Sequence, residues 1–335
     1  MTKLLTLLMP LILFIGCAKD DRPICPSCGE RATMQMHPRM SGMGIKSYYK
    51  CDNEHNFTKE GVLVNVFGKP LKKESTKVNP IKYTIAGDTV TITGCDKKAS
   101  GALIIPAVIE GKSVTRIRGY AFHNCNRLTG IMLPDSIKSI MEFAFSDCTR
   151  LTSITIPERV TSISHGAFKR CTRLTTIKVA TGNVDYKIVN GVLLNTEKTV
   201  LHTYPAGKTG SSYTIPNSVA RIEAHAFSEC ANLTSIMIPD SVTSIGSSAF
   251  RNCNSLTSIT IPDSVTSIGL QTFYFCWHLT AVTFLGDAPK NNERLAFSKT
   301  PATIYRKPDA KGWGDTLGGR PVKLISEQPQ EAEAE

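Results

Sequence analysis

A phrase recurs six times along the chain, and each copy ends on a cysteine. The clearest copy reads LTSIMIPDSVTSIGSSAFRNC and runs from Leu233 to Cys253. The cysteines of neighbouring copies are 23 residues apart within two sets, which are Cys125, Cys148, Cys171 and Cys230, Cys253, Cys276. A fixed period of this kind indicates a solenoid, in which each repeat buries its apolar face only by stacking on its neighbours.

The composition fits one long repeat domain and a small second unit. The chain has 335 residues, and 41% of them are apolar, which is enough for an extended core. Its formal net charge is +11, yet no long run of like charges occurs, so no nucleic-acid-binding arm is expected. Attraction to anionic surfaces or glycans is compatible with this charge. Residues 326–335 carry four glutamates and are expected to form a disordered acidic tail.

The N-terminus has the pattern of a bacterial export signal. Lys3 provides a positive charge, residues 4–15 form an apolar run too short for an ordinary membrane span, and Gly16 is a small residue at a cleavage position. Phe14-Ile15-Gly16-Cys17 resembles a lipobox, in which the cysteine is lipid-modified and begins the mature chain. We expect an exported lipoprotein anchored through Cys17, at the outer membrane or cell surface if the cell has two membranes. A plain signal peptide is the alternative.

Within the repeats, apolar residues recur at fixed distances from each cysteine. A leucine follows three residues later, and then two apolar positions alternate with one residue between them, as at Ile236 and Ile238. This period of two predicts a short strand with one buried face, which the following Pro239 ends. Equivalent strands should lie parallel and in register, about 4.8 Å apart. The Ala-Phe pair before each cysteine, as at Ala249 and Phe250, is expected to fill the core.

The period breaks once, because Cys171 and Cys230 are 59 residues apart. The stretch from Tyr186 to Pro205 predicts a β-hairpin that projects from one turn. Insertions in solenoids tend to lie on one face, often the binding face. The chain is thus divided into a signal and lipobox at 1–17, a cysteine-bearing module at 18–68, a linker at 69–80, a solenoid at 81–325 with the hairpin at about 181–210, and the tail at 326–335.

These repeats resemble a known family. Their phrase is similar to the BspA-like leucine-rich repeat of bacterial surface and secreted proteins, and Asn190-Gly-Val-Leu-Leu194 and Tyr204-Pro-Ala-Gly207 are similar to that family's usual insertion. The resemblance covers about residues 81–305. It implies a curved solenoid of mainly short parallel β-strands with turns and short helical segments. By association it also implies adhesion to host or matrix proteins, although repeats alone do not identify a ligand.

Residues 25–55 contain a spacing typical of zinc ribbons. Cys25-Pro-Ser-Cys28 precedes Cys51-Asp-Asn-Glu-His55, with 22 residues between Cys28 and Cys51. Three thiolates and one imidazole at this spacing can surround a tetrahedral structural zinc, which would staple a module too small for its own core. Four protein ligands leave no open position for a catalytic water. A disulfide among the three cysteines, formed in an oxidising compartment, is the alternative.

Two columns of the repeat are candidates for ligand binding. Arg127, Arg150 and Arg173 each follow a cysteine by two residues, so stacking would align three guanidinium groups along one edge. An acidic or sulfated ligand would relieve their repulsion, whereas a solvated edge without a ligand is the alternative. The outward strand column, which either docks a protein or simply faces solvent, includes Met132, Lys178 and Met237.

The remaining patterns argue for binding rather than catalysis. The stacked cysteines are expected to be buried thiols, because parallel stacking keeps their Cβ atoms farther apart than the ~3.8 Å that a disulfide prefers. No nucleophile, base and acid occur together, so an enzyme is not expected. We predict a non-enzymatic cell-envelope lipoprotein whose solenoid binds a protein or an anionic glycan. The alternative is a structural envelope-assembly protein whose solenoids associate laterally, and the sequence does not indicate the oligomeric state.

Overall fold

The computed structural model describes residues 80–290 and 295–329, together with the backbone of four short strands near the N-terminus. The chain divides into two compact units, Met1–Ser75 and Thr76–Glu335. In the first unit, an antiparallel sheet joins its strands in sequence order. These are β1 (Ala32–Gln35), β2 (Tyr48–Cys51), β3 (Asn56–Phe57) and β4 (Leu63–Val64).

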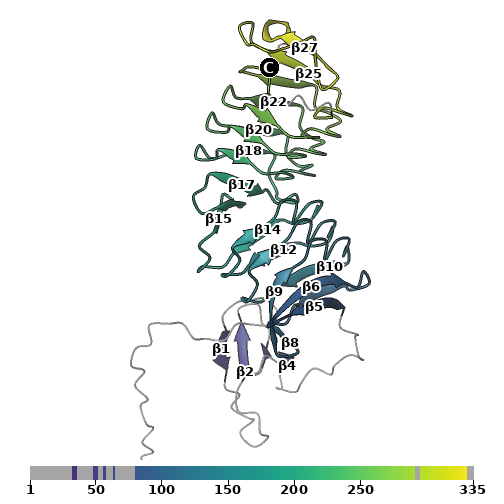
Figure 1. Cartoon of the computed structure of the whole chain (residues 1–335), viewed down its shortest axis with the longest axis vertical. Coiled ribbons are helices and arrows are strands. Elements are labelled where there is room, and N and C mark those ends of the chain that lie inside the picture. The colour runs from purple at the N-terminus through teal and green to yellow at the C-terminus, as the bar shows by residue number, and fades with distance from the viewer. Residues whose placement is uncertain are drawn as a thin grey trace, which may run out of the picture. The chain divides into compact units, whose positions relative to one another are not determined.

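The second unit is a β-solenoid of about nine turns (Figure 1). Its first column of strands holds the alternating apolar phrase of each repeat, and Ile154 lies beside Ile131 on one side and Ile177 on the other. Residues 23 positions apart are therefore lateral neighbours, as the spacing predicts. The strands of this column are β7 (Gly101–Ile104), β10 (Leu128–Met132), β12 (Ser153–Ile156), β14 (Thr176–Val179), β18 (Ser212–Thr214), β20 (Ser235–Met237), β22 (Ser258–Ile261), β24 (Ala281–Phe284), β25 (Thr303–Arg306) and β27 (Arg320–Leu324).

A second column of parallel strands, which after the first are two residues long, follows the proline of each repeat. It contains β9 (Lys112–Ile117), β11 (Ser139–Ile140), β13 (Ser162–Ile163), β19 (Arg221–Ile222), β21 (Ser244–Ile245) and β23 (Ser267–Ile268). Irregular units lie at the two ends of the solenoid, where they cover exposed strand edges. They include β5 (Ile81–Ala86), β6 (Thr89–Cys95) and β8 (Val108–Ile109) at the start, and β26 (Thr316–Leu317) at the end.

The third side of each coil consists of stacked turns, whereas the family resemblance implies short helical segments as well as turns. Within the described residues, the one helical segment is the 3-10 turn η1 (Ile325–Glu327). Two left-handed residues enclose each Ala-Phe segment, for example Ser248 (φ 56°) and Asn252 (φ 58°), and a right-handed helix cannot pass through them. The amides bond to the next coil instead, since the N–H of Phe250 donates to the carbonyl of Thr272 at 2.9 Å.

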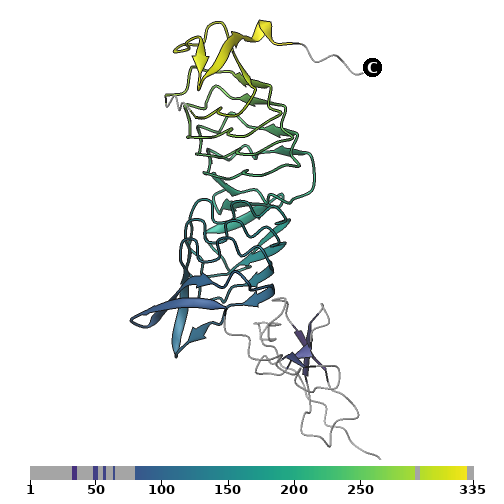
Figure 2. The same cartoon turned by 90° about the vertical axis from the view of Figure 1, so that its right-hand side faces the viewer.

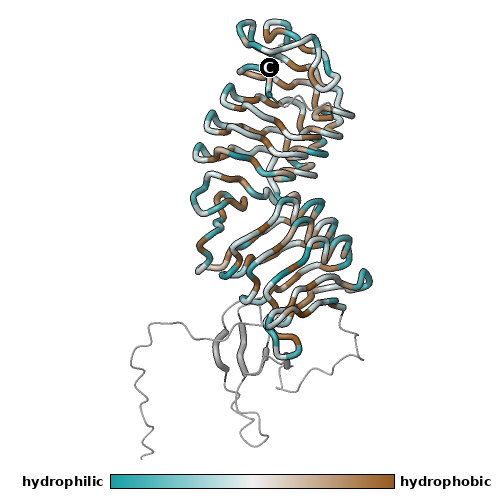
Figure 3. The backbone as a smooth tube through the Cα atoms, viewed as in Figure 1, coloured by the Kyte–Doolittle hydropathy of each residue, from teal (hydrophilic) through white to brown (hydrophobic). Residues whose placement is uncertain are grey.

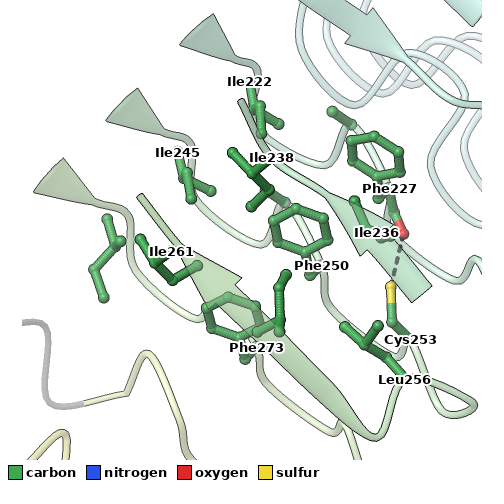
Figure 4. Packing of buried hydrophobic residues seen from close by; sticks show 14 of the residues in the cluster. Ile222, Phe227, Ile236, Ile238, Ile245, Phe250, Cys253, Leu256, Ile261 and Phe273 are labelled. Atoms are coloured by element: carbon green, nitrogen blue, oxygen red, sulfur yellow. Dashed lines mark hydrogen bonds between the residues drawn. The ribbon is translucent and has the colours of Figure 1, made fainter. Parts of the chain in front are cut away.

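The core is a stack of side chains that runs from coil to coil. Phe227, Phe250 and Phe273 are fully buried, and their ring centroids are 5.1 and 5.3 Å apart (Figure 4). Aromatic pairs at such distances attract one another beyond the effect of buried area alone. Figure 3 shows hydrophobic and hydrophilic residues alternating along each coil. The same stacking, at 5.2 and 5.7 Å, joins Phe122, Phe145 and Phe168.

The interruption between Cys171 and Cys230 divides this core into two hydrophobic clusters. Its residues form an antiparallel sheet of β15 (Tyr186–Val189), β16 (Val192–Asn195) and β17 (Val200–Thr203). β17 then pairs in parallel with β19, so the insertion joins the second column of strands. Figures 1 and 2 show this sheet between the two stacks of coils.

Two side chains of the insertion replace a missing strand beside β13. The Tyr186 hydroxyl accepts the backbone N–H of Ile163 at 2.7 Å, and His202 Nε2 lies 2.6 Å from the carbonyl of the same residue. Burial lowers the pKa of His202, so its neutral imidazole donates the Nε2–H to this carbonyl. The exposed backbone groups at the end of the column are thereby paired.

Candidate functional site

The lipidation and zinc predictions lie almost wholly outside the described residues. Cys17, Cys25, Cys28 and His55 are outside them, and of Cys51 only its place as the last residue of β2 is described. The zinc site therefore stays a prediction, which a zinc assay of the purified chain would contradict by finding no metal. In the described part of the chain, no three His, Cys, Asp or Glu side chains lie close enough together to hold a metal ion.

The structure places the arginine column as the sequence predicts. Arg127, Arg150 and Arg173 are exposed, and each directly precedes a buried leucine that holds the backbone in register. Their guanidinium groups form no hydrogen bond or ion pair with any described residue. Three cations on successive coils thus face solvent without a neutralising acid.

The outward strand residues do not form one site. Met132 lies in β10 and is half-buried, whereas Lys178 lies in β14 and is exposed. Met237 is 64% exposed in β20, on the other side of the insertion, where it lines a groove of about 440 Å³ with Thr214 and Pro239. Their shared column therefore spans both stacks of coils.

The cysteine column has a structural role. Cys253 is buried, and its thiol donates to the carbonyl of Phe227 in the preceding coil at 3.1 Å (Figure 4). Burial raises the pKa of the Cys253 thiol, which keeps it protonated and unreactive. The same bond recurs from Cys148, Cys171 and Cys276 to Phe122, Phe145 and Phe250 at 3.2, 3.1 and 3.0 Å.

A cluster that the sequence analysis missed forms where the Ala-Phe turns meet. Its centre is Phe143, whose ring centroid lies 5.1 Å from that of Tyr120 and 5.4 Å from that of His225. Lys169 Nζ lies 5.4 Å from the same Phe143 centroid. We call it the turn-edge cluster and define it by Tyr120, Phe143, Lys169, Arg170, His225, Arg251, Tyr274, Phe275 and Trp277.

Gly166 allows this meeting, because it stands in the coil between Phe143 and His225. Its φ is 65°, and a Cβ atom there would lie 2.5 Å from the Phe143 ring and 3.0 Å from the His225 ring. Contacts of this length are too short, so any larger residue would push the two rings apart. In the other copies, this position holds larger side chains, including Tyr120 and Gln271.

The insertion brings the two flanking coils together at the same edge. It carries no Ala-Phe-x-x-Cys segment, and Arg170 therefore reaches both Asp147, at 3.2 Å, and Glu229, at 3.8 Å. In the sequence, the signal of this contact is Gly166, at a position where the other repeats have larger residues. The contact between coils 59 residues apart follows only from the shape of the insertion.

Burial and nearby cations both lower the pKa values of groups in this cluster. The pKa of Lys169 is lowered, first by burial and then by nearby Arg251. Burial, followed by Lys169 and His165, lowers the pKa of His225 to about 3. His225 Nδ1 is buried and has no hydrogen-bond partner among the described residues. The cluster therefore holds a neutral histidine beside cations that repel one another, an arrangement that an anion would relieve.

The repeat also matches a defined family. A family model described as the BspA type leucine-rich repeat region matches residues 104–209 and 206–306, with six copies. The two matches span more than half of the chain. The chain belongs to this BspA-type leucine-rich repeat family. The cysteine column from Cys125 to Cys276 lies within the residues that match.

Solved structures of bacterial leucine-rich repeat proteins are similar to it. A leucine-rich cell surface protein of Faecalibacterium prausnitzii is 31% identical with a TM-score of 0.50, over 64% of this chain and 62% of that chain. This chain thus spans less than two thirds of that protein's length. A leucine-rich repeat protein of Eubacterium ventriosum is 25% identical with a TM-score of 0.46, over 68% and 76% of the two chains. No curated protein matches the sequence. Among the described residues, no helix has the length and apolar character needed to cross a membrane.

Proposed function

We propose that this BspA-type protein is a non-enzymatic protein of the cell envelope whose solenoid binds a protein or glycan partner. The observation that carries the proposal is the register of the coils, which presents columns of exposed side chains such as Arg127, Arg150 and Arg173 on a rigid support. Its family, and its similarity to a leucine-rich cell surface protein, support a place at the cell surface.

A binding experiment tests this function. The purified full chain, immobilised, should retain a partner from host or envelope extracts, and the purified partner should rebind saturably. Replacing all three arginines of the column with serine should leave the fold intact, because they are exposed, and should weaken binding of an anionic partner. Reversible, concentration-dependent association of the chain in the ultracentrifuge, with no saturable partner, would instead support lateral assembly.

Membrane anchoring depends on Cys17. Cells that express the full chain and are fed labelled palmitate should incorporate the label into this protein, because a lipobox cysteine receives fatty acyl chains. The C17S variant should carry no label and should leave the membrane fraction. Label that persists in C17S would rule out this residue as the anchor.

A further inference from the structure

Two cations of the turn-edge cluster are available to a ligand. Arg170 forms ion pairs with both neighbouring carboxylates, those of Asp147 and Glu229. Lys169 and Arg251 form no ion pair with any described residue. Both contact ring faces, and the Arg251 guanidinium also donates to Gln271 Oε1 at 3.1 Å. The pKa of Lys169 is lowered first by burial and then by repulsion from Arg251, and an anion placed between the two cations would relieve this repulsion.

Exposed aromatic rings flank these cations on both sides. The Arg251 guanidinium lies 4.8 Å from the centroid of Tyr274, and the ring of Phe275 lies 5.3 Å from that of Trp277. Trp277 is 52% exposed at this end, and Tyr120 is 54% exposed at the other. The cluster thus alternates ring faces and positive charges along the stacking direction.

The arginine column follows the turn edge by three residues along the chain, as Arg173 follows Arg170. Arg127, Arg150 and Arg173 each come two residues after the cysteine that ends a turn, and none has an acidic partner among the described residues. Arg127, Arg150 and Arg173 stand on successive coils about 4.8 Å apart. Lys169 and Arg251 share one position of the repeat, and the repeat between them carries Ser228 there. Such an arrangement is a basic strip rather than a single point charge.

The two ends of the cluster, Tyr120 and Trp277, are exposed. Three cavities of about 500, 440 and 440 Å³ in the described part of the chain are lined by other residues, such as Asp263, Ile188 and Pro239. Small molecules usually bind in concave sites that enclose most of their surface. A strip of this kind suits an extended polymer that runs across several coils.

We propose that the turn-edge cluster binds a linear acidic polysaccharide, whose sulfate or carboxylate groups contact Lys169 and Arg251 while its sugar rings pack on Tyr120 and Trp277. This inference rests on the proposed binding function and names its site and ligand class. The regular spacing of Arg127, Arg150 and Arg173 beside these cations suits a polymer that carries repeated charges. The face of an aromatic ring has a negative electrostatic potential, which attracts the C–H groups on the face of a sugar ring.

Binding of the full chain to four immobilised polymers tests the proposal. Heparin and polygalacturonate supply sulfate and carboxylate groups on sugars, dextran is a neutral polysaccharide, and poly-L-glutamate has charge without sugar rings. The chain should bind heparin or polygalacturonate, more weakly as salt rises, and should not bind dextran. K169Q/R251Q should weaken the binding about tenfold or more, because charge-assisted contacts are lost. The control K290Q/K307Q removes two positive charges elsewhere and should change it far less.

The aromatic contacts are tested separately. Y120S/W277S should weaken binding to the acidic polysaccharides several-fold and leave any binding to poly-L-glutamate unchanged, and circular dichroism should show that this exposed pair is not needed for folding. Equal affinity for poly-L-glutamate, with no effect of Y120S/W277S, would overturn the proposal in favour of an acidic protein. So would unchanged binding in K169Q/R251Q. If all four polymers fail to bind, the site is rejected, while saturable rebinding of an extract partner still supports the broader function.

Discussion

Phe250→Ala is expected to lower the free energy of unfolding by about 3–5 kcal/mol. The side chain is fully buried, and its ring lies between those of Phe227 and Phe273 at 5.1 and 5.3 Å. Alanine leaves a cavity that cannot collapse, because the hydrogen bonds between coils hold the backbone in register. Both stacking partners lose contact at once. Urea unfolding followed by far-UV circular dichroism measures the loss.

The position in a solenoid adds a second expectation for this variant. Each coil contacts only its neighbours, so damage in the middle of the second stack weakens two interfaces and can uncouple the coils on either side. Hydrogen exchange should therefore rise first in the coils that carry Phe227 and Phe273. Phe250→Leu is the matched control, because it keeps most of the volume and should cost about 1.5 kcal/mol or less. An F250A chain as stable as F250L would contradict the stacked core.

The columns of the solenoid were predictable because they depend on a local period. Once the cysteines are 23 residues apart, the neighbours of Phe250 and the partner coil of Cys253 follow from the alignment of the copies. The turns on the third side were less predictable. Asn252 is of a residue type that adopts the left-handed conformation more often than most, but Ser248 is not, and the sequence does not single it out.

The turn-edge cluster could not be predicted for a different reason. The contact of Phe143 with His225 crosses the insertion, where the register of the repeats no longer applies. The bond from His202 to the carbonyl of Ile163 likewise joins residues 39 positions apart. Sequence periodicity determines positions within each stack, whereas the fit between the stacks depends on the shape of residues 181–210.

The fit between the stacks is expected to weaken in acid. The pKa of His202 is lowered by burial, which outweighs the opposing effects of Ile163 and Glu223, and that of His225 is lowered to about 3 by burial and nearby cations. In the unfolded chain, both histidines titrate near 6.5. Below that pH the unfolded state binds more protons than the folded state, so stability falls as pH falls.

The expected loss is about 1.4 kcal/mol per pH unit for each histidine that stays neutral in the fold. Urea unfolding at pH 7.5, 6.5 and 5.0 measures this loss of stability. In this pH range most carboxylates stay ionised, so the histidines cause most of the change. H225Q should reduce the slope of the unfolding free energy against pH by the contribution of one histidine. H202Q should have the same effect, and its side-chain amide can still donate a hydrogen bond to the carbonyl of Ile163. The F250L chain, which keeps both histidines, should retain the full slope.

The location of the two histidines determines where acid acts. Protonated His202 would put a charge among buried groups, and it could no longer accept the Thr203 hydroxyl at Nδ1, 3.1 Å away. Protonated His225 would add a third charge beside Lys169 and Arg251. Both changes act at the junction of the two hydrophobic clusters and leave the stacked phenylalanines of each untouched. Acid should therefore increase hydrogen exchange across residues 183–207 before it does so at Phe250, and uniform exchange along the chain would contradict this account.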